Sequence, residues 1–538
     1  MAMSEDDVSA QLTTPRPVGP VRGDADAGRD RTGRLHGAVD VTARVRAALS
    51  NPIKSAADDH FDIHAALAEV LADVGLSADD CGGRVEFVGA DPIVPSAVRL
   101  GAAPAVGLVA KSVGVAALWR HRGGAGQDIR MDLRKAPRRL CPFYDKKWEL
   151  VNGLPPTNTA DPGNPLSLTF YQAGDGRWVM PLNIYPKLKS RTLKLLRTYD
   201  DATAIAAAIA KWKAIELEEA GADAGIVMPM VRSTEEFLET KQYQDVLAEL
   251  PLIEIEKIGD SAPEPLPAGA VQPLDGIRAL GLGHVIAGAG IGRALAQHGA
   301  DALNLWRPTE WENPVVYLTA NVGVRSATLD YARNPAAMET LRELLRGADV
   351  FYANRRPGQV SSLGLSPQQA AAIRPGIIHT TVSLHGEQGP WSTRVGFDQT
   401  AGCVTGMMTL EGSADQPVLP HIGVVNDYLV PWLATAGICS ALIRRATEGG
   451  SYRVHISLTR IALWIISMGV FDKNYARGIA GTGGDHAYLD PDTFTAETPL
   501  GLYQGVTDQV QLSATPGAFR TILVPRGSGR PVWLPTGL

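Results

Sequence analysis

The sequence is poor in cysteine and has no excess of basic residues. Its 538 residues include only four cysteines, and no two of them form a CxxC pair. This usage predicts neither a disulfide framework nor a zinc site and is typical of a reducing compartment. Lysine and arginine number 51 against 57 aspartates and glutamates, which gives a net charge of -6 at pH 7. Because a nucleic-acid-binding protein normally carries a basic domain, we expect no nucleic-acid partner.

The sequence also lacks the patterns of secretion and membrane insertion. The N-terminal residues do not show the charged and then apolar order of a signal peptide. One apolar run, residues 100–119, has the length of a membrane span, but Lys111 interrupts it and small residues dominate it. This composition favours a buried helix over a transmembrane one. We therefore expect a soluble, cytoplasmic protein with no membrane partner.

The signatures of several large enzyme classes are missing. The chain has no GxSxG, GxxxxGK[ST] or HExxH motif, and its 11 histidines are spread out without metal-ligand spacing. Hydrolase, ATPase and metalloenzyme chemistry are therefore disfavoured. We expect no metal and no tightly bound cofactor.

Changes of composition along the chain predict its organisation. Residues 1–38 contain almost no large apolar side chains, cannot offset their ordering entropy, and are predicted to form a disordered tail. Ala-rich helical patterns follow to about residue 140. Residues 174–186 predict a turn followed by a strand, and residues 204–221 predict a helix. Beyond a Pro- and Ala-rich linker at residues 259–272, strands alternate with helices, which predicts an α/β fold with a parallel, doubly wound sheet.

A glycine-rich turn lies between two predicted strands in residues 280–308, LGLGHVIAGAGIGRALAQHGADALNLWRP. A dinucleotide-binding turn requires GxGxxG and an acidic residue at the end of the second strand. Here Arg293 takes the place of the third glycine and Trp306 that of the acid, so NAD binding is disfavoured. Two interpretations stay open. The amides at the helix N-terminus bind another phosphorylated or anionic group, or the glycines only make a tight turn.

Two adjacent arginines follow another predicted strand in ANRRPGQVSSLGL, residues 353–365. The strand ends at Asn354, so Arg355 and Arg356 stand at the carboxyl edge of the sheet, where α/β proteins bind ligands. Such a pair suits a phosphate or a carboxylate. A solvated basic loop explains the same residues equally well.

Asp427 stands between an apolar, strand-like run and an apolar helix in PHIGVVNDYLVPWLATAGI. A carboxylate at such a junction is usually a helix N-cap. It can also be a nucleophile that its apolar neighbours partly desolvate. The residues alone leave both interpretations open.

Five segments of residues 273–458 resemble, in order, the class III CoA-transferases, the group of formyl-CoA transferase, carnitine CoA-transferase and alpha-methylacyl-CoA racemase. The resemblance implies a Rossmann-like large domain with a smaller α+β domain, an interlocked homodimer, and an acyl-CoA and a carboxylic acid as small-molecule substrates. The segments are PLDGIRALGLGHVIAGAGIGRALAQHGADALNLWRP, NVGVRSATLDYARNPAAMETLRELLRGADVFYANRRPG, RPGIIHTTVSLHGEQGPWSTRVGFDQTAG, VVNDYLVPWLATAGICSALIRR and GGSYRVHISL.

The resemblance also implies a mechanism. Asp427 matches the family's nucleophile, which attacks the donor thioester and becomes an aspartyl-CoA thioester that an acceptor acid then resolves. The segment GTGGDHAY falls where the family has a glycine-rich loop, a candidate lid or oxyanion donor. The implied contacts of the CoA nucleotide are His284, Ala287, Arg307, Asn354 and Arg356, and the loop glycines are Gly481, Gly483 and Gly484.

Two departures from the family pattern keep alternatives open. Val324 stands where the family usually has lysine, which removes one CoA contact. Phe397 replaces the histidine of the racemases' GHD motif, and phenylalanine cannot transfer a proton. The alternatives are an acyl-CoA isomerase or racemase of the same family and a non-catalytic acyl-CoA-binding descendant.

The chain repeats one unit of helix, glycine-rich turn and strand. Residues 114–133 and 437–458 share this pattern about 324 residues apart, too far for a solenoid period. The resemblance implies a fused, rearranged family member whose first copy has Ala102 or Ala103 at the nucleophile position. The predicted divisions are 39–160, a partial copy that lacks the nucleophile; 161–258, the small domain; 259–272, the linker; and 273–538, the catalytic large domain.

Overall fold

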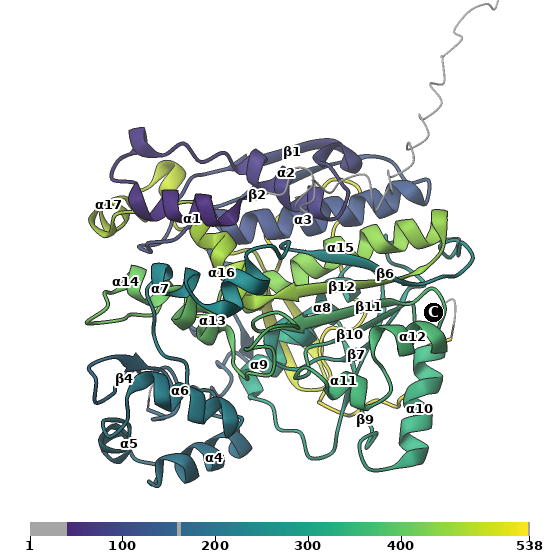
Figure 1. Ribbon diagram of the computed structural model, residues 1–538. Coiled ribbons are helices and arrows are strands. Elements are labelled where there is room, and N and C mark those ends of the chain that lie inside the picture. The colour runs from purple at the N-terminus through teal and green to yellow at the C-terminus, as the bar shows by residue number, and fades with distance from the viewer. Residues whose placement is uncertain (1–39, 159–162, 536–538) are drawn as a thin grey trace, which may run out of the picture.

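Seven strands form one sheet in the centre of the molecule, in the order β6-β12-β11-β10-β7-β8-β9 (Figure 1). All neighbours are parallel except β6 and β12. The computed structural model describes residues 40–158 and 163–535, and this sheet confirms the predicted parallel α/β arrangement. The predicted tail, residues 1–38, lies outside the described residues. The strands are β6 (Glu254–Gly259), β7 (Arg278–Leu282), β8 (Asp301–Trp306), β9 (Arg325–Thr328), β10 (Val350–Ala353), β11 (Ile378–Ser383) and β12 (Ser451–Ser457).

Helices cover both faces of this sheet. On one face α10 and α12 pack against leucines of β7 and β8. On the other face α8 and α15 pack against smaller side chains of β7, β8 and β10. Glycine lets α8 approach closely, because a Cβ on Gly292 would lie 2.3 Å from the hydroxyl oxygen of Tyr352. The helices are α8 (Val285–Ala296), α10 (Pro335–Arg346), α12 (Pro367–Ile373) and α15 (Asn426–Glu448).

The strand order places a switch point between β7 and β10. From β7 the chain proceeds to β8 and β9 on one side, and β10, β11 and β12 follow on the other. In open α/β sheets the crevice at the carboxyl ends of such a strand pair binds ligands. His284 and Asn354, which follow these two strands, are therefore brought together.

A second, three-stranded sheet repeats part of this order. β2 pairs with β1 in parallel and with β15 in the antiparallel direction, as β12 pairs with β11 and β6. Helix α3 precedes β2, as α15 precedes β12, and the two helices pack side by side (Figure 1). The elements are α1 (Val41–Ser50), α2 (Ile63–Asp73), β1 (Gly82–Val88), α3 (Ala102–His121), β2 (Gln127–Asp132) and β15 (Val510–Leu512).

The apolar run around Lys111 forms α3. By length and composition this helix could cross a membrane, but 94% of its apolar window is buried inside the protein. The Lys111 ammonium donates to Asp508 Oδ2 at 2.5 Å and to Gln297 Oε1 at 2.8 Å, so the buried charge is paired. The predicted buried helix is confirmed.

A lobe of short elements lies beside these sheets, and two elements predicted in it differ in extent from the structure. The strand predicted in residues 174–186 shortens to β5. The helix predicted over residues 204–221 is two helices, because Asp175 Oδ2 accepts the N–H of Ala214 and starts α6 anew. The lobe contains β4 (Tyr171–Gln172), β5 (Trp178–Val179), α4 (Pro186–Leu196), α5 (Ala202–Ile209) and α6 (Ala214–Asp223).

The remaining elements connect these parts. They are β3 (Leu150–Val151), α7 (Thr234–Leu238), α9 (Pro314–Ala320), α11 (Gln359–Ser362), α13 (Asp398–Thr405), α14 (Met407–Glu411), α16 (Leu458–Ser467), α17 (Lys473–Ile479), β13 (Thr493–Thr498) and β14 (Gly501–Val506).

Candidate active site

Asp427 is the second residue of α15. Val425 occupies the N-cap position and no side chain of the helix caps it, so the interpretation of Asp427 as a helix cap is wrong. The residues before the helix form an irregular, bent segment rather than the predicted strand. Within the part of the chain that the structure describes, the Asp427 carboxylate accepts no hydrogen bond. A buried carboxylate with free lone pairs at a helix N-terminus suits a nucleophile.

Asp398, the first residue of α13, does the capping instead. Its Oδ2 accepts the N–H of Val425 at 3.0 Å and that of Asp427 at 2.7 Å. Burial raises the pKa of Asp398 to about 7. Burial and the negative charges of Asp398 and Glu312 raise the pKa of Asp427 well above its usual range. The fold therefore controls how readily Asp427 ionises.

A pocket with about 560 Å³ of empty space lies beside Asp427. Three parts of the chain line it: residues 143–158, the lobe, and the half of the chain that carries Asp427. Phe397 belongs to its wall and stacks on Tyr185, with ring centroids 5.5 Å apart and planes 13° from parallel. Other lining residues are Phe143, Tyr144, Asn158, Asn313, Gln399 and Val424.

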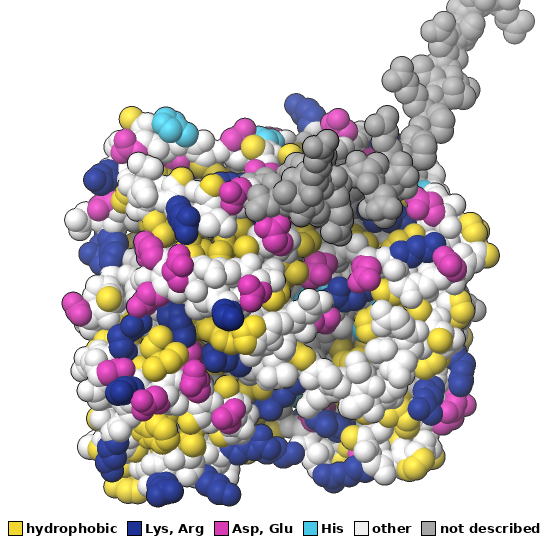
Figure 2. Space-filling view, in the orientation of Figure 1, with side chains coloured by type: hydrophobic (Ala, Val, Ile, Leu, Met, Phe, Trp, Pro, Cys, Tyr) yellow, Lys and Arg dark blue, Asp and Glu magenta, His cyan; other side chains and the backbone are white. Residues whose placement is uncertain are grey.

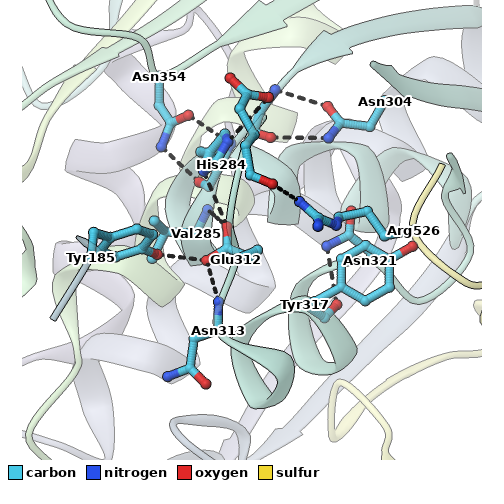
Figure 3. A network of polar contacts seen from close by, with 12 residues as sticks. Tyr185, His284, Val285, Asn304, Glu312, Asn313, Tyr317, Asn321, Asn354 and Arg526 are labelled. Carbon is cyan, nitrogen blue, oxygen red and sulfur yellow. Dashed lines mark hydrogen bonds and ion pairs between the residues drawn. The ribbon is translucent and has the colours of Figure 1, made fainter. Parts of the chain in front are cut away.

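Side chains accept the hydrogen bonds of the N–H groups in the glycine-rich turn before α8 (Figure 3). The N–H groups of residues 283–285 donate in turn to Asn304 Oδ1, Asn354 Oδ1 and Glu312 Oε2, each at 2.8 Å. The carboxylate of Glu312 therefore occupies the N-terminus of α8, where an anionic ligand was one of two possibilities. These contacts favour the other interpretation, in which the glycines make a tight turn.

Two buried glutamates, Glu310 and Glu312, hold two of the predicted CoA contacts, His284 and Arg307. The His284 ring lies between them, with Nδ1 3.2 Å from Glu312 Oε2 and Nε2 3.4 Å from Glu310 Oε2. Although burial lowers the pKa of His284, the two neighbouring carboxylates raise it above the usual value. Arg307 and Arg355 both pair with Glu310 Oε1, at 2.6 and 2.5 Å. Sequence reasoning missed Glu310 and Glu312, although two acidic residues soon after a predicted strand were an available signal.

Arg356 faces the lobe rather than the glutamates. A Cβ on Gly225 would lie 3.2 Å from Arg191 Nη1 and 3.5 Å from Arg356 Nη1, so the two guanidinium groups border one space. In the described ranges neither arginine forms an ion pair. Partial burial and the charge of Arg191 lower the pKa of Arg356. Figure 2 shows Lys and Arg side chains gathered at the lower centre of this face, near the lobe.

The other predicted site residues lie outside the pocket. Ala287 is buried within α8. The glycine-rich loop, residues 481–484, is exposed, and the next residue, Asp485, accepts the N–H of Ala90 through its carbonyl oxygen at 2.9 Å. The structure therefore brings this loop to the end of β1 and not to Asp427.

The sequence was compared with known proteins. Residues 274–515 match CoA-transferase family III. The human succinyl-CoA:glutarate CoA-transferase is 30% identical over 192 residues, which are 33% of this chain and 43% of that protein. The acetyl-coenzyme A transferase nodX of Hypoxylon pulicicidum is 30% identical over 216 residues, 39% of this chain and 36% of that protein. The chain thus spans less than half the length of these relatives. A solved CAIB/BAIF family protein from Brucella suis is similar at 25% identity and a TM-score of 0.34, covering 43% of this chain and 65% of that one.

Proposed function

Because residues 274–515 match CoA-transferase family III, we propose that the chain is an acyl-CoA:carboxylate CoA-transferase with Asp427 as its covalent nucleophile. One observation carries this proposal. The buried carboxylate of Asp427 borders a pocket at the start of α15 and, among the described residues, accepts no hydrogen bond. The helix N-terminus favours negative charge there.

The proposed cycle consists of acyl transfers that balance within the substrates. The Asp427 carboxylate attacks the thioester carbonyl, the C–S bond breaks, and an acyl-aspartyl anhydride and CoA thiolate form. The thiolate attacks the aspartyl carbonyl, releases the first acid and leaves an aspartyl-CoA thioester. The acceptor carboxylate attacks that thioester and expels the thiolate, which then attacks the acceptor carbonyl of the new anhydride. The new acyl-CoA leaves and Asp427 is regenerated.

Arg356 and Arg191 are the groups we propose for the CoA phosphates. Both are exposed arginines without an acidic partner in the described chain, and guanidinium groups bind phosphate in a bidentate manner. Arg307 and His284 are already paired with glutamates, which makes them weaker candidates.

The finer architecture belongs to the same proposal. The strand order and the helices on both faces support a doubly wound, Rossmann-like large domain, with the lobe as the smaller domain. The cytoplasmic location remains a prediction, and so does the interlocked homodimer that the resemblance implies, although the packing of α3 on α15 within one chain speaks against it. Sedimentation analysis and cell fractionation test them.

The two alternatives make different predictions. An isomerase or racemase would need a proton-transferring group where Phe397 stacks on Tyr185, and phenylalanine has no proton to transfer. A non-catalytic descendant would bind acyl-CoA without forming a covalent adduct.

The test is the intact mass of the protein after incubation with a panel of acyl-CoAs. We expect a CoA-sized adduct that hydroxylamine removes and that Asp427→Asn does not form, since the amide keeps the shape of the side chain but is a poor nucleophile. CoA binding by the native protein without an adduct from any donor would contradict the proposal and favour the binding protein.

A further inference from the structure

The walls of the Asp427 pocket are apolar. Leu168, Leu182, Ile184, Val285, Ile286 and Val316 line it together with aromatic rings, and none of its lining residues is Lys, Arg or His within the described chain.

Several uncharged polar groups in the lining already hold partners. Gln399 Nε2 donates to the carbonyl of Gly423 at 2.8 Å, and Asn313 Nδ2 donates to Asn158 Oδ1 at 3.1 Å. The hydroxyl of Tyr185 donates to Glu312 Oε1 at 2.5 Å. These groups can orient a ligand, but they bring no positive charge.

Carboxyl groups lie in and around the pocket. Asp427 faces it, and Asp398 and Glu312 lie close enough to raise the pKa of Asp427. Two buried cations, Arg139 and Arg293, line a different pocket, where Arg139 already pairs with Asp508 at 2.8 Å. His284 lies outside the lining and pairs with Glu312. A second carboxylate on the acyl group would thus lose its water among apolar side chains, with no cationic side chain in the described lining to pair with it.

From this lining we propose that both acids handled at Asp427 are apolar monocarboxylic acids, with no second charge on the acyl group. This inference rests on the proposed function. Because donor and acceptor react at the same aspartate in turn, one pocket selects both. The related human enzyme is named for succinyl-CoA and glutarate, which are dicarboxylic, so the pocket predicts a different substrate class here.

Two acyl-CoAs of equal carbon number test the proposal. Pentanoyl-CoA and glutaryl-CoA differ only in the terminal carboxylate, and the rate of adduct formation is followed by intact mass. We expect pentanoyl-CoA to load the protein at least about 100-fold faster, since burying an unpaired carboxylate costs several kcal/mol.

Variants at Val316 sharpen the test, because this lining residue is only half-buried. Val316→Arg adds a cation and is expected to reduce the preference at least about tenfold, whereas Val316→Met, a neutral control of similar length, should keep it. Equal or faster loading by glutaryl-CoA in the native protein would overturn the inference and leave the proposed function standing. Loading by neither compound, despite CoA binding, would overturn both.

A different observation carries a second inference, namely the pairing of α3 with α15. Gly107 lies against Leu429 and Trp432, and Gly114 lies against Ala436. The contacts advance together along both helices, so the helices run parallel. Their offset matches that of the sequence repeat, about 324 residues, so equivalent turns face each other.

The starts of the two helices are also built alike. Asp91 Oδ1 accepts the N–H of Gly101 at 2.9 Å and its Oδ2 accepts that of Ala102 at 2.7 Å. Asp398 performs the same task at the start of α15. Where α15 then carries Asp427, α3 carries alanine.

Each of the two repeated units contributes residues near the start of the other unit's helix, α15 or α3. After β2, residues 143–144 line the Asp427 pocket. After β12 the chain continues to residues 481–486, and Asp485 there contacts Ala90, next to Asp91. This exchange explains why the glycine-rich loop does not lie at Asp427.

We infer that residues 40–144, together with β15, take within this chain the place of a second copy, related to the first by an approximate two-fold axis along α3 and α15. This face of α15 is then not available to another chain, and the pocket at Asp427 needs no residue from a second subunit. The homodimer implied by the resemblance is therefore not required at this face.

Sedimentation velocity and specific activity, measured together over a hundredfold dilution, test this second inference. We expect a species of 57.2 kDa at the low end with unchanged activity per chain and one CoA adduct per chain. Activity that falls as a dimer dissociates would overturn it. If no activity is found, Gly114→Val still tests the pairing, because its side chain would meet the backbone of Ala436. We expect its Tm to fall by at least about 3 °C, whereas Gly478→Val, which meets no neighbour within 4 Å, should change little.

Discussion

Replacing Asp398 with asparagine tests whether this carboxylate controls the ionisation of Asp427. The amide oxygen can keep both hydrogen bonds that Oδ2 accepts from the backbone of α15. The new NH₂ group would face the amide of Asn426, whose Oδ1 is buried and has no partner among the described residues. A flip of that amide supplies an acceptor. The substitution therefore keeps shape and hydrogen bonding and removes one charge.

The expected effect on stability follows from the raised pKa. A pKa of about 7 in place of 3.8 corresponds to a cost on the order of 4 kcal/mol for ionising buried Asp398. Because the folded-state pKa is the higher one, this group's contribution to stability is full below about pH 4 and is lost as the pH rises through about 7. Denaturant unfolding at pH 5 and pH 8 should show that Asp398→Asn loses less stability than the native protein over this interval.

The same substitution should move the pH dependence of the reaction. Only the ionised Asp427 attacks a thioester, so adduct formation is expected to rise with pH, and the charge of Asp398 raises the pKa of Asp427. In Asp398→Asn the rising limb should lie at lower pH, as intact mass after timed incubation between pH 5 and 9 would show.

Asp91→Asn is the matched control for this experiment. Asp91 caps α3 as Asp398 caps α15, and burial raises its pKa as well, but it faces no nucleophile. It should alter the pH dependence of stability and leave the rising limb in place. An unmoved limb in Asp398→Asn, or a moved limb in Asp91→Asn, would refute the reasoning.

Three further predictions concern binding and stability. Arg191→Gln and Arg356→Gln should each raise the Kd for CoA about tenfold and weaken its dependence on salt in calorimetry; unchanged binding would place the CoA phosphates elsewhere. Glu312→Gln keeps an acceptor for the N–H at the start of α8 but removes a charge, so it should lower the pKa of His284, read by NMR titration, and a static value would contradict the contact. Lys111→Met leaves Asp508 without one of its two buried cations and should lower the free energy of unfolding by about 3–5 kcal/mol, whereas a neutral result would contradict the burial of this pair.

The sequence by itself determined the elements that local pattern encodes. The alternation of strands and helices after residue 273 predicted the parallel sheet, because period and turn chemistry are properties of neighbouring residues. The apolar run around Lys111 indicated a buried helix for the same reason. The ordered motifs singled out Asp427, although the residues around it alone allowed a helix cap just as well.

Only the tertiary structure decided what surrounds that residue. Asp398 caps α15 from another helix, and Glu312 fills the helix N-terminus that the glycine-rich turn offered to an anion. Arg191 joins Arg356 from a separate lobe. Such contacts join residues far apart in the chain and leave no periodic trace in it. Which carboxylate caps, which one stays free and which charges a pocket lacks are therefore settled when the parts pack together.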